Sequence, residues 1–171
     1  MKYIFTLLIL FTQIFAYIDS INSFEADFTQ SVTDEKKKVL SYSGHIIASK
    51  PQNALWKYNT PVKKEIYINA FNVTVIEPEI EQVIIRKLES NFDLFNMIKN
   101  AKQIDKNTYK AFYKDSEFII TTKNDMIESI SYLDEFENSV KIVFTHQKQN
   151  EVIDPEVFMP KIPIDFDVIR D

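Results

Sequence analysis

Residues 44–61 carry the pattern that most constrains the fold, an alternation of apolar and polar side chains on either side of a turn. Before the turn, Gly44 and Ile46 share one face, and after it Trp56 and Tyr58 do the same. A proline and an asparagine between the two runs favour the turn itself. Since the side chains of a strand point alternately to its two faces, the pattern predicts two strands of a sheet with one apolar face.

The same alternation recurs along most of the chain, with turn residues between the runs. We expect strands at residues 39–50, 55–59, 65–69, 72–76, 81–88, 108–114, 117–123, 127–133 and 139–148, and a last one near 164–168. Short turns between the first five strands indicate a meander. Because the chain has one glycine, its turns must rely on Asn, Asp and Pro.

Helical segments are few. Apolar residues spaced three and four apart predict an amphipathic helix over residues 17–30. A second short helix is expected over residues 91–100 with Asn91 as its cap, and Asp154 followed by a proline predicts one further turn of helix.

About ten strands in one sheet curl or close rather than stay flat. We therefore expect a mainly β, α+β fold in which one strongly curved antiparallel sheet, with only a few helical turns to fill it, encloses an apolar cavity. The residues expected to line this cavity are Ile21, Phe24, Phe28, Ile46, Trp56, Tyr58, Val73, Val83, Phe118, Ile130 and Ile142. The same apolar faces would serve equally as an ordinary solid core.

The N-terminal segment indicates export. Residues 1–16 combine one lysine, an apolar run and a small residue at the end, as secretory signal peptides do. We expect cleavage there, a single domain over residues 17–171 and a periplasmic address. The chain has no cysteine to form a disulfide or to accept a lipid of its own.

Neither catalysis nor nucleic-acid binding is indicated. A net charge of −5 argues against a nucleic-acid footprint, and the two histidines, His45 and His146, each stand alone in a strand pattern. The glutamates at 77–81 flank a proline in a turn, which is typical of a solvated loop. No Ser–His–Asp order and no Gly-rich phosphate loop is present, so we expect neither an enzyme, nor a cofactor, nor a metal site.

Several segments resemble one family. They are SFEADFTQSVTD at residues 23–34, Lys50 with its proline, the Trp-Lys-Tyr run from Trp56, and Gln82 with Val83. In this order and at this length they resemble the periplasmic lipoprotein carrier family LolA.

The resemblance implies an incomplete β-barrel with a helical lid and a role without catalysis. A LolA-type carrier, expected to be monomeric, accepts acylated outer-membrane lipoproteins from an inner-membrane ABC transporter of the LolCDE type. It shields their acyl chains and delivers them to the outer membrane, in many bacteria through a LolB-type receptor. Lys50 stands where the family usually has an arginine that helps to control the lid, and lysine keeps the charge without the fork of donors.

Two other functions remain open from the sequence. A non-catalytic periplasmic sensor with a similar curved sheet would bind a protein partner instead of lipid, and it would not show competition between an apolar dye and an acyl ligand. An enzyme using the glutamates at 77–81 is the third and weakest alternative.

Overall fold

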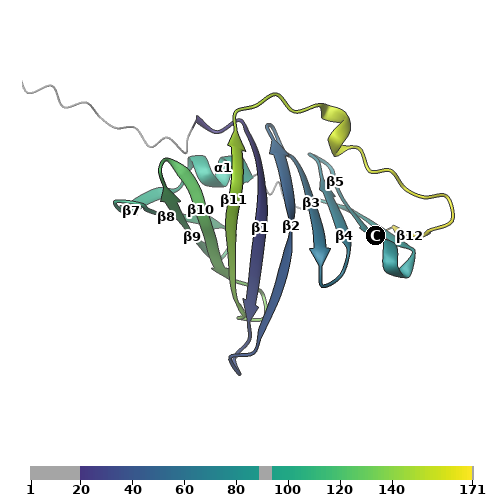
Figure 1. The fold of residues 1–171 in the computed structure, drawn as a ribbon, viewed down its shortest axis with the longest axis horizontal. Coiled ribbons are helices and arrows are strands. Elements are labelled where there is room, and N and C mark those ends of the chain that lie inside the picture. The colour runs from purple at the N-terminus through teal and green to yellow at the C-terminus, as the bar shows by residue number, and fades with distance from the viewer. Residues whose placement is uncertain (1–19, 89–93, 171) are drawn as a thin grey trace, which may run out of the picture.

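The computed structural model describes residues 20–88 and 94–170, which form one curved sheet of 12 strands with one short α-helix (Figure 1). The spatial order of the strands is β12-β6-β5-β4-β3-β2-β1-β11-β10-β9-β8-β7. The sheet does not close into a barrel, and the prediction of a mainly β, incomplete barrel is confirmed. The expected signal segment and the Asn91 cap lie outside the described residues.

The N-terminal half of the sheet is a meander, as the short turns predict. Its strands are β1 (Ser23–Thr33), β2 (Val39–Ser49), β3 (Asn53–Thr60), β4 (Lys64–Ile68), β5 (Asn72–Glu77) and β6 (Gln82–Lys87). Each pairs antiparallel with the next in sequence, and a 3-10 turn, η2 (Pro78–Ile80), lies between the last two.

The C-terminal half is a second meander joined to the first through β1. It contains α1 (Leu94–Lys99), β7 (Lys102–Asp105), β8 (Thr108–Tyr113), β9 (Ser116–Lys123), β10 (Met126–Leu133) and β11 (Ser139–Gln149). β11 pairs antiparallel with β1, so the two longest hairpins lie side by side in the middle of the sheet.

The chain beyond β11 crosses the upper edge of the sheet, as the yellow segment of Figure 1 shows. It forms η3 (Pro155–Phe158) and then β12 (Asp167–Arg170), which pairs parallel with β6. The carboxylate of Asp154 accepts a hydrogen bond from the backbone N–H of Glu156 at 2.9 Å, so the predicted helix start is confirmed.

The predicted helix over residues 17–30 is wrong for its described part, where residues 23–33 form β1. Phe24 and Phe28 fit a helical spacing, but with Ala26 they also fit a strand whose other face carries Glu25 and Asp27. The long antiparallel strands β2 and β11 form hydrogen bonds with the backbone of β1 on both sides. This pairing favours the strand over the helix. The short strand β7 was missed because all four of its residues are exposed and show no alternation.

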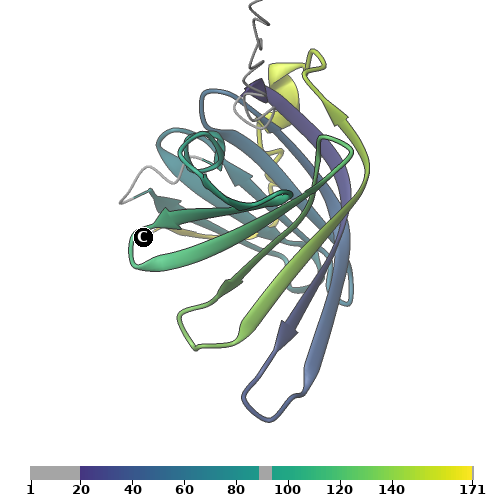
Figure 2. The same ribbon diagram turned by 90° about the vertical axis from the view of Figure 1, so that its left-hand side faces the viewer.

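Apolar residues pack on both faces of the sheet. The larger cluster lies on the concave face, inside the curve seen in Figure 2, and includes Phe24, Phe28 and Ile46 together with residues of α1. The smaller cluster, which we call the convex cluster, consists of Leu55, Tyr67, Ile76, Val83 and Phe158. The C-terminal segment supplies Phe158, so the convex face of β3–β6 is covered by the chain itself.

The single glycine serves packing rather than a turn. Gly44 lies in β2 at a shift in the pairing with β3, and its φ is not positive. A Cβ there would overlap the carbonyl oxygen of Lys57 and lie 2.8 Å from the ring carbon Cζ of Phe28. The left-handed turn positions are taken by other residues, among them Asn124 and Asp125.

Candidate binding cavity

A cavity of about 380 Å³ lies on the concave face of the sheet. β3 and β4 form one wall with Trp56, Ile66 and Ile68, and β9, β10 and β11 form the opposite wall. The lining is largely apolar, because the inward positions of each strand carry the apolar half of the alternation.

Helix α1 covers one end of this cavity. Phe95, Met97 and Ile98 are buried, and Leu94, Phe95 and Met97 face the cavity. Next to the cavity, Phe95 and Ile98 meet Phe24 and other concave residues with almost no space between them. The helix therefore closes one end of the concave side of the sheet, as Figure 2 shows.

Five of the eleven residues predicted from the sequence line the cavity, namely Trp56, Tyr58, Phe118, Ile130 and Ile142. Ile21, Phe24, Phe28 and Ile46 belong instead to the packed concave core around it. Phe28 meets the rings of Trp56 and Tyr58 edge to face at 5.0 and 5.1 Å between centroids, so it packs beside the cavity wall on the same face of the sheet.

The two remaining predicted residues lie elsewhere. Val73 is half-buried in β5 opposite Ile68 and does not line the cavity. The placement of Val83 in the cavity is wrong, because Val83 pairs with Ile76 and packs in the convex cluster under Phe158. β6 has apolar residues on both faces, so its alternation does not tell which face is concave.

Several lining residues were not predicted from the sequence. Leu94, Phe95 and Met97 come from α1, and the place of this helix inside the cup is a tertiary property. Ile66 and Ile68 alternate along β4 and could have been chosen by the same rule that selected Trp56. Gln30 was missed because a polar residue is not expected on an apolar face.

Polar groups gather at the end of the cavity away from α1. The hydroxyl of Tyr58 donates to Oε1 of Gln30 at 2.9 Å, and the Tyr42 ring stands edge-on to Tyr58 at 6.1 Å. Burial raises the pKa of Tyr58 to about 12, with further contributions from Tyr132 and Tyr42. Burial also raises the pKa of Tyr132, and these tyrosines therefore stay neutral at physiological pH.

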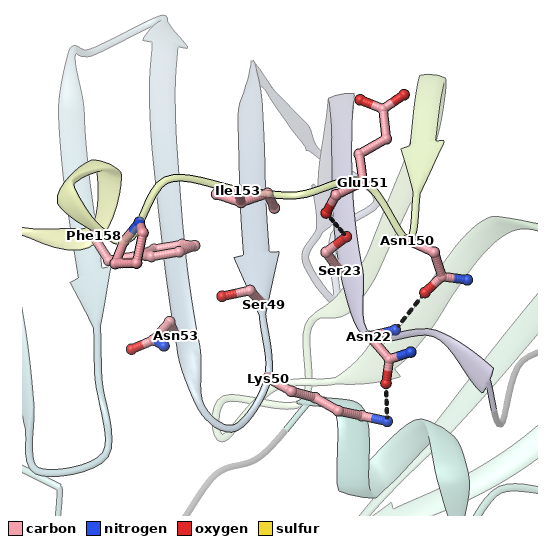
Figure 3. Close-up of a pocket in the computed structure, with 10 residues that line it drawn as sticks. Asn22, Ser23, Ser49, Lys50, Asn53, Asn150, Glu151, Ile153 and Phe158 are labelled. Carbon is pink, nitrogen blue, oxygen red and sulfur yellow. Dashed lines mark hydrogen bonds between the residues drawn. The ribbon is translucent and has the colours of Figure 1, made fainter.

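Lys50 directly follows β2, at the edge of the sheet that is uppermost in Figure 1, and lies beside a second pocket of about 310 Å³ on the side of the C-terminal segment (Figure 3). Its ammonium group donates to Oδ1 of Asn22 at 3.0 Å, and its backbone N–H donates to the Asn22 carbonyl at 2.9 Å. Nearby, the Ser23 hydroxyl donates to the carbonyl of Glu151. These bonds fasten the start of β1 to the end of β2 and to the chain after β11.

The two histidines are not isolated, contrary to the prediction. On the convex face, the carboxylate of Asp27 bonds Nδ1 of His45 at 2.8 Å and Nδ1 of His146 at 2.9 Å. These two hydrogen bonds hold the pKa of Asp27 below its ordinary value. Across residues 20–88 and 94–170, no group of three or more His, Cys, Asp or Glu side chains is arranged to hold a metal ion.

Comparison with known proteins identifies the family. Residues 19–115 match the family model described as outer membrane lipoprotein carrier protein LolA. An outer-membrane lipoprotein carrier protein of Campylobacter jejuni is 43% identical over 171 residues, 99% of this chain and 100% of that protein. This chain belongs to the LolA family. A LolA relative from Wolinella succinogenes, also named an outer-membrane lipoprotein carrier protein, is 30% identical over 156 residues, 91% of each chain.

A solved structure agrees with the LolA fold described above. The crystal structure of an uncharacterized conserved protein from Thermus thermophilus superposes with a TM-score of 0.55 at 12% identity, over 91% of this chain and 94% of that one. LolA-family proteins are carriers and not enzymes. In the part of this LolA-family chain that the structure describes, no helix is long and apolar enough to cross a membrane.

Proposed function

We propose that this protein carries acylated lipoproteins and that the cavity on the concave face holds their acyl chains. The observation that carries the proposal is the apolar cavity of about 380 Å³ between the curved sheet and α1. A solid core would need this space filled, because protein interiors are close-packed. The naming of the relatives as lipoprotein carriers supports the same choice of ligand.

The energetics of an acyl chain fit such a carrier. Each methylene removed from water contributes roughly 0.8 kcal/mol, so one long chain costs on the order of 10 kcal/mol to leave exposed. The carrier must offset that cost and still release the cargo. Helix α1 has six residues and is not part of the sheet, so its displacement would open the cavity without breaking a strand pairing.

The wider route follows from this role. The protein would act in the periplasm after removal of residues 1–16, take its cargo from a LolCDE-type transporter and deliver it to the outer membrane. A LolB-type receptor is the expected acceptor where one exists. We expect the carrier to work as a monomer, since one cavity on one chain suffices to cover one cargo.

Lys50 is proposed to influence opening from the upper edge of the sheet. Its ammonium group is tied to Asn22, just before β1, and β1 carries residues that pack against α1. Loss of this tie in Lys50→Leu should loosen the support of α1 and impair release or reloading, whereas Lys50→Arg keeps the charge and serves as the matched control. Unchanged lipoprotein release by Lys50→Leu would contradict this role.

A transfer experiment tests the carrier proposal. Spheroplasts with a labelled lipoprotein and the cognate transporter are incubated with the mature protein, and the soluble fraction is examined for a one-to-one complex. The complex should form with the acylated lipoprotein and fail with the same lipoprotein lacking its acyl chains. No complex from a folded protein would overturn the proposal.

A further inference from the structure

The cavity has two chemically different ends. At the closed end, α1 contributes Leu94, Phe95 and Met97, and the neighbouring concave core is apolar. At the other end, Gln30 from β1 and Tyr132 from β10 line the cavity together with Tyr58 from β3. Polar groups from three separate strands thus converge on one end of the cavity.

Hydrogen-bonding capacity is left over at this polar end. Oε1 of Gln30 accepts from the Tyr58 hydroxyl, which fixes the side-chain amide with its nitrogen as the remaining donor. Among the described residues, neither this amide nitrogen nor the Tyr132 hydroxyl has a hydrogen-bond partner. Polar groups that are partly buried and lack protein partners are suited to hold a ligand.

The side chains at the polar end are partly exposed to solvent. Gln30, Tyr58 and Tyr132 are half-buried, whereas Phe95 and Met97 at the α1 end are buried. The ammonium group of Lys64 stands 5.1 Å from the centroid of the Tyr58 ring. Tyrosines with one apolar side and one polar tip are typical of a boundary between lipid and water.

In a lipoprotein, each acyl chain is attached through an ester or amide bond. The carbonyl oxygen of that bond accepts hydrogen bonds. We propose that the Gln30 amide nitrogen and the Tyr132 hydroxyl donate to the acyl carbonyls of the cargo, and that the chains extend from there toward α1. The inference rests on the proposed carrier function and deepens it by assigning the two ends of the ligand to the two ends of the cavity. Tyr58 acts as a positioning residue, because it holds the Gln30 amide in place.

The cavity offers one competing place for the carbonyls. Gln52 and Asn53, in the β2–β3 turn and at the start of β3, also line it. Both have amide nitrogens that could donate. Because Asn53 is shared with the second pocket at the upper edge, a ligand with carbonyls there would run in the opposite direction.

The test compares two synthetic lipopeptides that differ only in their carbonyls. One is an S-dipalmitoylglyceryl cysteine peptide with ester links, and the other is its dialkyl analogue with ether links. Displacement of an environment-sensitive dye gives the dissociation constant of each for the wild type, Tyr132→Phe, Gln30→Met and Asn53→Leu. Tyr132→Phe removes only a hydroxyl, and the circular dichroism spectrum and denaturation midpoint of each variant show that it is folded.

We expect the wild type to bind the ester form more tightly, and Tyr132→Phe and Gln30→Met each to lose roughly fivefold in ester affinity, the effect of about one hydrogen bond. The ratio of ester to ether affinity should fall by the same factor. Equal binding of both forms by the wild type, or loss of the ester preference in Asn53→Leu alone, would overturn the assignment and leave the carrier function standing. Failure of both lipopeptides to bind would overturn the carrier function itself.

Discussion

The two apolar clusters of this protein are built from the two faces of the same sheet but are completed differently. On the convex face of β3–β6, the C-terminal segment supplies Phe158, and the convex cluster is filled by the chain itself. On the concave face, the sheet and α1 leave about 380 Å³ unfilled. Alternation alone therefore cannot separate a structural face from a binding face. The distinction depends on whether some segment of the chain returns to cover it.

Truncation in the convex cluster should give the largest loss of stability. Phe158→Ala would leave a cavity under the C-terminal segment and lower the free energy of unfolding by about 4 kcal/mol, as measured by chemical denaturation. Acyl-probe binding should be kept in the folded fraction. Trp56→Ala on the cavity wall should cost less than half of this, because Trp56 is half-buried and already borders empty space, but it should weaken probe binding. Equal losses from both changes would contradict the distinction between the faces.

A change at Gly44 should show that the concave face is tight outside the cavity. The Cβ of Gly44→Ala would meet the backbone of Lys57 and the ring of Phe28, neither of which can easily move. We expect a loss of about 3 kcal/mol, at the upper end of typical overpacking costs, measured by urea denaturation. Ala26→Gly in the neighbouring strand tests the general cost of changing a small core residue. A neutral Gly44→Ala would mean that the β2–β3 pairing is looser than the structure shows.

Two adjacent residues compare the faces most directly. Ala54 lines the cavity, and Leu55 is buried in the convex cluster. Leu55→Phe should cost about 2 kcal/mol by overpacking, whereas Ala54→Phe should change stability by less than about 1 kcal/mol because its ring can enter the cavity. Ala54→Phe should reduce the amount of acyl probe bound, and Leu55→Phe should not. A larger loss of stability in Ala54→Phe, with reduced probe binding in Leu55→Phe, would contradict the assignment of the free space to the concave face.

The smallest effect is expected outside both clusters, at Asp27. Hydrogen bonds with His45 and then His146 lower the pKa of its carboxyl from the ordinary value of 3.8. A depressed pKa in the folded state contributes stability above the unfolded-state pKa, and this contribution is lost as the pH falls through the folded-state value. Asp27→Asn should therefore lose stability at neutral pH and converge with the wild type in strong acid. Denaturation midpoints measured across this range would contradict the prediction if the difference stayed constant.

The period of most strands and the meander of the N-terminal half follow from the residue pattern alone. Alternation around Trp56 and Tyr58, with a proline in the turn before them, suffices for this because strand geometry is local. Neighbouring residues also determine the start of η3 at Asp154, because a cap and a proline act within one helical turn. The family resemblance also came from short segments, and it brought the correct fold class with it.

The other features depend on contacts between segments that are far apart in the chain. Residues 23–33 fit both a helix and a strand, and long-range pairing with β2 and β11 chose the strand. Val83 is buried on the convex face, where the C-terminal segment covers it. Helix α1 lines the cavity on the concave face, although its own sequence shows only that it is amphipathic. Gln30 and Tyr132 became neighbours of one cavity through strands far apart in the chain. The free energies of such contacts cannot be read from a local residue pattern.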